Sequence, residues 1–297
     1  MARVSILMNG YNSEKYLKEA IDSIYAQTYN DWEIIFIDNC STDNTKEIVD
    51  SYDNIKYFKT KTNIPLGEAR NFGLTKCKGE YLAFLDTDDI WLKDKLKEQI
   101  ELLDSNRKLQ MCYGGAIWID ENGNKIGQDL PKAKTGFIFD KQLIRYEVNM
   151  QSVVIRNSID ISFNTFMEFS PDYDLFMRIM SIYQVGVIGR ALVKYRKLSN
   201  SLTSKKIDRW AIEIEESLND IFKNNPSLKD KYSREYSLAY AKVGYYYAQY
   251  FVSINDMKKA RASLFRYRLL NKQYLFLYLL SYFPASIWMW IINLNNK

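Results

Sequence analysis

The chain has 297 residues, of which 47% are hydrophobic. This composition excludes wholesale disorder and allows one large α/β domain with an appendage, or two domains. It contains no histidine, so general base catalysis falls to Asp or Glu. Its three cysteines are widely spaced and form no C-x-x-C motif, which favours reduced thiols in the cytosol over a disulfide framework or a zinc site.

Charge is distributed unevenly along the chain. The net charge is +5, but residues 205–297 hold 15 Lys and Arg against 8 Asp and Glu. Six cations cluster without an intervening acid: Lys258, Lys259, Arg261, Arg266, Arg268 and Lys272. Because an uncharged, aromatic segment follows directly at 273–296, the cluster favours an anionic lipid surface over nucleic acid as a partner.

The first third of the chain alternates strand and helix patterns. Short apolar runs predict strands at 4–8, 33–37, 55–58 and 81–85. Helical periodicity predicts a helix with the apolar stripe Leu17, Ala20, Ile21 and Ile24, capped by Asn12 or Ser13, and further helices through Ile48–Val49, at 68–74 and at 92–103. Alternating strands and helices predict an α/β domain with a mostly parallel sheet.

The pattern changes from Met111 onward. Segments at 111–119, 150–155 and 186–195 are β-like, a turn is predicted at 120–123, and an amphipathic helix at 174–182. After residue 205 the periodicity is helical nearly to the end. We therefore expect an α/β domain over 1–204 and a helical region over 205–297.

An apolar run at 81–85 stops abruptly at Asp86, Asp88 and Asp89. In open α/β sheets, ligands bind just beyond the carboxyl ends of strands. Asp86 and Asp88 alternate, so they face the same side of an extended backbone, and a cation such as Mg²⁺ with substrate phosphates would relieve their repulsion. The alternative is that Asp88 or Asp89 caps the helix at 92–103.

Five segments, in order over residues 3–204, resemble the family 2 glycosyltransferases of the GT-A fold. They are VSILMNGYN (4–12), IDNCSTDNT (37–45), NIPLGEARNFGL (63–74), DTDD (86–89) and SPDYDL (170–175). Each segment is weak evidence by itself, whereas five in order at plausible spacing are strong. The resemblance implies a GT-A-like fold with a nucleotide-sugar-binding half (1–110) and an acceptor-binding half (111–204).

The nucleobase end of a donor site is expected at the first two strand ends. Tyr11 would stack on the base, although a core tyrosine covering the sheet end is the alternative. The resemblance adds Asn9 to the nucleotide-binding set. Asp38 and Asn39 end the second strand and can bond the ring edge of uracil; a turn asparagine is the alternative for Asn39.

Arg70 is the candidate for the diphosphate, because a guanidinium matches phosphate geometry with two parallel bonds. A solvated surface charge is its alternative. By resemblance, Asp86 would hold the ribose or the metal, and Asp88 would hold the Mg²⁺ or Mn²⁺ that bridges the diphosphate. Asp89 fits better as a helix cap.

The resemblance makes Asp172 the catalytic base that takes the acceptor proton, with the N-cap of the following helix as the alternative. Asp174 is the internal control, expected to matter less. Met150, Gln151 and Arg196 are expected on the acceptor side, with a place facing the diphosphate as the alternative for Arg196. Two departures stand out: the family's Glu before the base is Pro171 here, and Leu198 replaces a frequent His near the metal. Either metal dependence is weaker, or coordination rests on Asp88, phosphates and water.

Tyr274 to Leu294 is long enough to cross a bilayer. However, Pro284 interrupts it, Ser281 and Ser286 flank that proline, and its aromatic residues are spread throughout. Two helices lying in the membrane interface fit better. A true span, or a helical hairpin packed on the domain or on a second copy, are the alternatives.

The combined prediction is an inverting glycosyltransferase. It would move a hexose or N-acetylhexosamine from a nucleotide-diphosphate sugar, most simply UDP-linked, to a hydroxyl of a glycan or lipid-linked acceptor in polysaccharide biosynthesis. It would work in the cytoplasm, peripheral on the inner face of the membrane, without nucleic acid and with a homo-oligomer possible. The rivals are a sugar nucleotidyltransferase, which would carry a Gly-rich basic loop after the first strand, and a non-catalytic binding module.

Overall fold

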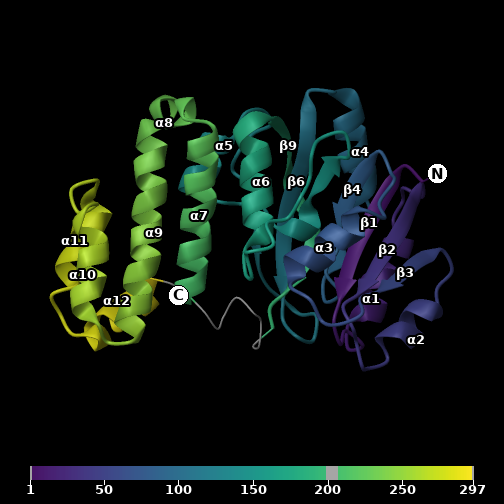
Figure 1. Cartoon of the computed structure of the whole chain (residues 1–297), viewed down its shortest axis with the longest axis horizontal. Helices are drawn as coiled ribbons and strands as arrows, with labels where there is room; N and C mark the ends of the chain where they lie inside the picture. The colour runs from purple at the N-terminus through teal and green to yellow at the C-terminus, as the bar shows by residue number, and fades with distance from the viewer. Residues whose placement is uncertain (1, 199–206, 296–297) are drawn as a thin grey trace. The chain divides into compact units, whose positions relative to one another are not determined.

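The computed structural model describes residues 2–198 and 207–295. The chain divides into two compact units, one formed by Met1–Phe139 and Tyr146–Leu198 and the other by Asp140–Arg145 and Ser199–Lys297 (Figure 1). The six residues 140–145 thus group with the C-terminal helices, although they lie within the predicted acceptor-binding half. The first unit contains the sheet and carries the candidate site.

Within the described residues, the first unit is built on a nine-stranded sheet with the order β3-β2-β1-β4-β8-β6-β9-β5, and β7 pairs with β6. The strands are β1 Val4–Gly10, β2 Trp32–Asp38, β3 Ile55–Lys59, β4 Tyr81–Phe84, β5 Ile90–Trp91, β6 Leu109–Ile119, β7 Lys125–Asp129, β8 Val154–Arg156 and β9 Gln184–Arg196. The first four strands are all parallel, whereas β8 is antiparallel to both β4 and β6. The parallel arrangement predicted from the sequence holds for β1 to β4, and β6 and β9 also pair in parallel.

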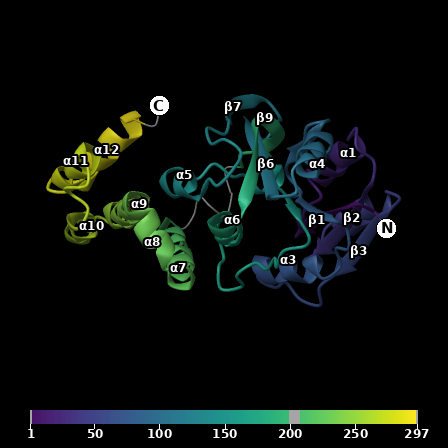
Figure 2. The ribbon, with the colours of Figure 1, turned by 90° about the horizontal axis from the view of Figure 1, so that it is seen from above.

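Helices cover both faces of this sheet. They are α1 Leu17–Tyr25, α2 Thr45–Asp50, α3 Leu66–Leu74, α4 Lys95–Ser105 and α6 Pro171–Ile182. Figure 2 shows α1 and α4 on one face and α3 and α6 on the other. Alternation along β1 explains the two layers: Ile6 and Met8 join the core that contains α1 and α4, while Leu7 faces α3. The backbone of α3 comes close there, since a Cβ on Gly73 would lie 2.3 Å from a methyl of Leu7.

The predicted strands and helices of the first third are confirmed, but the predicted caps are wrong. The N-cap of α4 is Asp94, because Ile90–Trp91 pairs with β9 and carries the chain past the acidic cluster before the helix begins. Asp88 and Asp89 therefore do not cap it. Asn12 adopts a φ of 51° and accepts a hydrogen bond from Thr42 N, while the N-cap of α1 is Tyr16.

The strand predicted at 150–155 is shorter and preceded by a turn. Met150–Ser152 forms a 3₁₀ turn, η1, and β8 begins only at Val154. The reason is local: the side chain of Asn149 accepts a hydrogen bond from Gln151 N and caps the turn. Gln151 is thereby carried out of the strand register.

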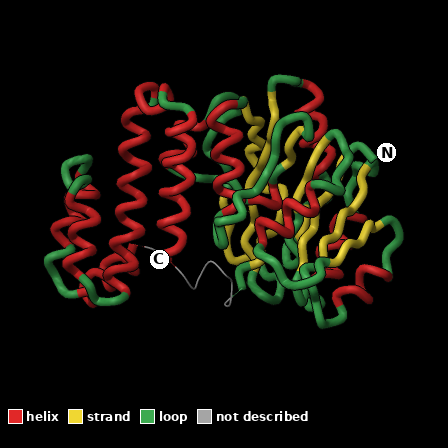
Figure 3. The backbone as a smooth tube through the Cα atoms, in the orientation of Figure 1, coloured by secondary structure: helices red, strands yellow, loops and turns green. Residues whose placement is uncertain are grey.

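The second unit is helical, as expected. Its helices are α5 Phe139–Ile144, α7 Ile207–Asn224, α8 Ser227–Lys231, α9 Ser233–Ser253, α10 Met257–Phe265, α11 Lys272–Leu280 and α12 Ala285–Asn295 (Figure 3). Ala248 of α9, Leu264 of α10, Leu277 of α11 and Trp288 of α12 share one core. Across the described residues, every helix is too short or too polar to traverse a bilayer.

Candidate active site

Side chains join the loops that follow β1 and β2. Asn12 Oδ1 accepts from Thr42 N (2.9 Å), and Ser41 Oγ accepts from Asn12 N (2.9 Å). These reciprocal bonds hold the two loops together beyond the carboxyl ends of the strands. Tyr11 lies in the first loop and is 54% exposed. An accessible aromatic ring on a braced loop, and not a core tyrosine, therefore lies at the end of β1.

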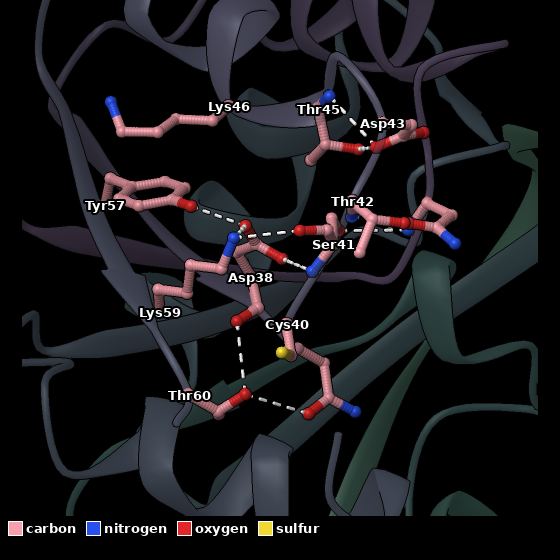
Figure 4. Close-up of polar contacts among 12 residues, drawn as sticks. Asp38, Cys40, Ser41, Thr42, Asp43, Thr45, Lys46, Tyr57, Lys59 and Thr60 are labelled. Carbon is pink, nitrogen blue, oxygen red and sulfur yellow. Dashed lines mark hydrogen bonds and ion pairs between the residues drawn. The ribbon is translucent and has the colours of Figure 1, made fainter. Parts of the chain in front are cut away.

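Asp38 is buried at the end of β2 and organises the second loop (Figure 4). Its Oδ1 accepts from Ser41 N at 2.6 Å, its Oδ2 accepts from the Tyr57 hydroxyl, and Lys59 Nζ lies 3.5 Å from Oδ2. Burial opposes ionisation, but the hydrogen bonds of Tyr57 and Ser41 and the charge of Lys59 hold the pKa of Asp38 below its usual value. The carboxylate is therefore ionised and bound to protein at both oxygens.

Asn39 is also bound to the protein. Its Nδ2 donates to Ile64 O (2.8 Å), and its Oδ1 accepts from Ile64 N (3.0 Å) and from the Thr60 hydroxyl (3.1 Å). The side-chain amide thus pairs with the backbone N–H and C=O of Ile64, as a neighbouring strand would, and holds the segment before α3. Asn9 differs, because its Oδ1 is buried without a hydrogen-bond partner among the described residues. Of the polar groups predicted for base recognition, Asn9 retains an unused acceptor.

Arg70 and Gln151 hold the two oxygens of Asp86. Arg70 Nη2 lies 3.2 Å from Asp86 Oδ1, and Gln151 Nε2 donates to Oδ2. Arg70 is only 5% exposed, so it is not a solvated surface charge, and its Nε is buried without a partner in the described chain. A buried guanidinium with a spare donor beside a half-exposed carboxylate forms a polar site next to β4.

Arg70 and Gln151 together form what we call the clamp on Asp86. Asp88 lies next to this clamp and differs from Asp86 in its environment. It has no ion-pair partner in the part of the chain that the structure describes. Burial, and then the charge of Asp86, raise the pKa of Asp88 to about 6. Such a carboxylate gains from a nearby cation, and one or two carboxylates with substrate phosphates are the usual protein ligands of Mg²⁺. The residues present therefore fit a divalent cation.

That cation would depend on ligands from outside the chain. Across residues 2–198 and 207–295, no three Cys, Asp or Glu side chains are grouped so that they can hold a metal. Asp88, with Asp86 beside it, would supply the protein ligands, and phosphate oxygens and water would supply the rest. The site thus fits a cation that arrives with a nucleotide.

Asp172 lies in the first turn of α6 and is half-buried. The N-cap is Ser170, so the helix-cap alternative for Asp172 is wrong. Burial raises the pKa of Asp172, the charge of Arg70 lowers it, and the charge of Asp86 raises it further. The carboxylate therefore shares the electrostatic environment of the Arg70–Asp86 pair. Asp174, by contrast, is buried and accepts from Arg178 Nε at 2.8 Å.

Two tyrosines join the site that the sequence did not single out. Burial is the main reason why the pKa of Tyr195 is raised. The charges of four aspartates, which include Asp86 and Asp172, raise it further. The Tyr146 hydroxyl is buried without a partner among the described residues, and burial and Asp172 raise its pKa. Tyr195 precedes Arg196 in a segment that the resemblance covers, but no sequence signal marks Tyr146.

Arg196 braces the acidic loop, and its predicted place on the acceptor side stays a prediction. It is 3% exposed, its Nε donates to Asp88 O (2.9 Å), and its Nη2 pairs with Glu19. Its backbone N–H donates to Asp89 Oδ1 at 2.7 Å. Burial raises the pKa of Asp89 well above its ordinary value. Both residues therefore hold the loop that presents Asp86 and Asp88.

The remaining predicted acceptor residues lie in η1. Met150 is 6% exposed and Gln151 is 3% exposed. The amide nitrogen of Gln151 donates to Asp86, and its expected bond to a sugar hydroxyl stays a prediction. The direct acceptor role of Met150 stays a prediction.

Comparison with known proteins identifies a family. The model of the family described as glycosyl transferase family 2 matches residues 5–176. An uncharacterized glycosyltransferase of Methanocaldococcus jannaschii, MJ1057, is 32% identical over 203 residues, which are 65% of this chain and 70% of that protein. The UDP-Glc:alpha-D-GlcNAc-diphosphoundecaprenol beta-1,3-glucosyltransferase WfgD of Escherichia coli is 30% identical over 207 residues, 68% of this chain and 80% of WfgD.

Other relatives are much longer than the matched part. An uncharacterized glycosyltransferase of Rickettsia felis is 35% identical over 216 residues, which are 69% of this chain but 35% of that protein. Solved structures share the fold at low identity. TarS of S. aureus in complex with UDP-GlcNAc superposes with a TM-score of 0.59 at 20% identity, over 96% of this chain and 90% of that one. The mannosyltransferase PcManGT of Pyrobaculum calidifontis, with GDP-Man and Mn²⁺, gives 0.61 at 14%, over 100% and 88%.

Proposed function

The chain belongs to glycosyl transferase family 2 and is a glycosyltransferase. We propose that it transfers a hexose or N-acetylhexosamine from a UDP-linked donor with inversion at the anomeric carbon. The acceptor would be a hydroxyl of a glycan or of a lipid-linked sugar in surface-polysaccharide assembly. The observation that carries this proposal is the shared environment of Arg70, Asp86 and Asp172 beside the carboxyl end of β4. The names of WfgD and of the UDP-GlcNAc complex of TarS support a UDP-linked donor.

The donor would lie along the strand ends. Tyr11 would stack on the base and Asn9 would use its unpaired acceptor, with Asp38 and Asn39 shaping the loop beneath. The spare Nε of Arg70 would bind a phosphate oxygen, and Asp86 would receive the ribose or the metal. A divalent cation at Asp88 would neutralise charge on the departing diphosphate.

Asp172 would act as the base in a single in-line displacement. The acceptor oxygen forms a bond to the anomeric carbon while its proton passes to Asp172. The bond from that carbon to the diphosphate oxygen breaks, and its electron pair leaves with the nucleoside diphosphate. Burial, which raises the pKa of Asp172, makes this carboxylate a stronger base than an exposed one.

The proposal is tested by sugar transfer and UDP release from a panel of nucleotide sugars with Mg²⁺, Mn²⁺ or EDTA. We expect one donor to be consumed, and Asp172→Asn and Asp88→Ala to lose on the order of 10²–10⁴-fold in kcat. Asp174→Asn is the matched control, because it lies in the same helix turn and its carboxylate binds Arg178. Release of pyrophosphate from sugar phosphate and UTP would instead establish a nucleotidyltransferase. A wild type that binds no nucleotide would favour a binding module.

The second unit supports docking on an anionic membrane. In α11 and α12, one stripe is buried, including Leu277 and Trp288. Large apolar side chains also cover the exposed side, which we call the apolar face: Leu275, Phe276, Leu279, Tyr282, Phe283, Ile287, Met289 and Trp290. Contiguous exposed apolar surface is a liability in water unless it meets a lipid or protein surface.

The second unit also carries basic side chains. Lys258, Lys259, Arg266 and Lys272 are exposed, while Arg261 lies over the Tyr282 ring at 3.8 Å and donates to Ser281 O. Cations beside an interfacial apolar surface favour anionic headgroups, at about 1 kcal/mol per charge near the surface. We propose that this unit holds the enzyme on the cytoplasmic leaflet beside a lipid-linked acceptor.

Vesicle co-sedimentation tests the membrane proposal. The full chain should bind vesicles with anionic lipid more than phosphatidylcholine vesicles, and less at high salt. Phe276→Ser with Trp290→Ser should reduce binding. Phe166→Ser is the matched control, because Phe166 is 90% exposed in the first unit. Equal loss in both variants, or concentration-dependent dimerisation without vesicle binding, would overturn the membrane assignment.

A further inference from the structure

The turn η1 determines where Gln151 meets Asp86. Gln151 is 3% exposed, and its Nε2 donates to the oxygen of Asp86 that Arg70 does not bind. Because the side chain is buried, it has little freedom to follow Asp86 if the turn moves. The position of the turn backbone therefore sets the position of one half of the clamp on Asp86.

Two buried side chains, one from β5 and one from α4, donate hydrogen bonds to backbone carbonyls of this turn. Trp91 Nε1 donates to Gln151 O at 3.0 Å, and Gln99 Nε2 donates to Ser152 O at 2.8 Å. Trp91 is 3% exposed and Gln99 is fully buried. Two successive carbonyls of the turn are thus held by donors from residues more than 50 positions away in the chain.

Neither of these donors touches Asp86 itself. Their hydrogen bonds to the turn act on Asp86 through the Gln151 side chain, and Gln99 Nε2 also lies 3.3 Å from Cys112 O of β6. Loss of either donor would leave a buried carbonyl without its partner, a state that favours a shifted turn. A shift below 1 Å suffices to disturb a contact that must meet a carboxylate oxygen in a fixed direction.

We propose that Trp91 and Gln99 are positioning residues that maintain donor affinity by holding η1, so that Gln151 fixes Asp86. The inference rests on the proposed function, in which Asp86 contacts the donor. It assigns to the β5–α4 segment a role in substrate binding that its burial by itself would not indicate.

Two pairs of variants of the full chain test the proposal. Trp91→Phe keeps an aromatic ring but removes the indole N–H and one of the two fused rings. Trp32→Phe is its matched control, because it loses the same ring and the buried Trp32 Nε1 has no hydrogen-bond partner in the described chain. Gln99→Met removes the amide, and its Oε1 has no hydrogen bond to lose. Gln27→Met is its control, because Gln27 is a buried glutamine that binds Leu92 O and Leu96 N instead of the turn.

The first measurement is hydrogen–deuterium exchange of the ligand-free protein. The bonds from Ser152 N to Asn149 O and from Val153 N to Met150 O should open more often when either donor is lost. We expect faster exchange at 151–153 in Trp91→Phe and Gln99→Met than in Trp32→Phe and Gln27→Met. Equal exchange in variant and control would overturn the proposal even if the donor chemistry is as proposed.

The second measurement is the steady-state kinetics with the donor that the wild type consumes. We expect the donor KM to rise on the order of tenfold in Trp91→Phe and Gln99→Met, with a smaller change in kcat. The controls should retain the wild-type KM. Faster exchange with an unchanged KM would overturn the positioning role. If wild type binds no nucleotide sugar, the proposed function fails with it, while the exchange data still show whether these side chains hold the turn.

Discussion

Arg70 Nη2 lies 3.2 Å from Asp86 Oδ1, and this pair joins helix α3 to the loop after β4. Arg70 is nearly buried, whereas the Asp86 side chain is 35% exposed. The charge of Arg70 also lowers the pKa of Asp172. The Arg70 guanidinium thus both holds the carboxylate of Asp86 and lowers the pKa of the proposed base, Asp172.

Replacing Arg70 should separate these two effects. Arg70→Lys keeps a positive charge but loses the planar fork, so donor KM should rise roughly tenfold with little change in the pH profile. Arg70→Met removes the charge, so the pKa of Asp172 should rise and the acidic limb of the kcat profile should move to higher pH. Identical pH profiles for the two variants would contradict the electrostatic role.

Gln151→Met should release one oxygen of Asp86 while conserving side-chain volume. Because the amide is buried and bound to a charged group, we expect a loss of about 1.5–3 kcal/mol in donor binding. Titration calorimetry with the nucleoside diphosphate and Mn²⁺ measures it. Met150→Leu in the same turn is the control, and equal affinities in the two variants would contradict the clamp.

Cation binding should depend on pH through Asp88. Its pKa is raised to about 6, so the carboxylate is ionised at pH 7.5 and protonated at pH 5. A cation must displace that proton, and apparent Mn²⁺ affinity should fall as pH decreases through 6, approaching tenfold per unit. Asp88→Asn should bind weakly at all pH values. A flat affinity between pH 7.5 and 5 in wild type would contradict this assignment.

Lys95 should give stability a distinctive pH dependence. It is fully buried, its Nζ lies 4.0 Å from the centre of the Trp91 ring, and burial lowers its pKa from 10.5 to about 7. Between those values the unfolded chain binds the extra proton, so the free energy of unfolding should rise with pH, by up to about 1.4 kcal/mol per unit. Lys95→Met should lose this slope.

Urea unfolding at pH 7, 7.25, 7.5 and 7.75 measures the slope while most thiols and tyrosines of the unfolded chain are still protonated. Lys97→Met is the matched control, because Lys97 is exposed on the same helix. Parallel curves for wild type and Lys95→Met would show that the amine does not change its proton near pH 7.

The local pattern of apolar and polar residues was sufficient to predict much of the secondary structure of the first unit. Alternating apolar runs and helical stripes predicted the first four strands and the core face of α1, because each element must bury one side whatever its neighbours are. The acidic cluster after β4 and the motifs around Asp38, Arg70 and Asp172 indicated the family and the edge of the sheet where the site lies.

The detailed roles depended on partners that are distant in the chain. Asp89 and Arg196 bind each other across 107 positions, and Gln151 reaches Asp86 across 65. Neither pairing leaves a periodic signal, so the sequence pattern alone predicts a helix cap for Asp89 and acceptor-side positions for Arg196 and Gln151. Side-chain hydrogen bonds and burial follow from how the sheet brings strand ends together, and a one-dimensional pattern of apolar and polar residues does not contain those distances.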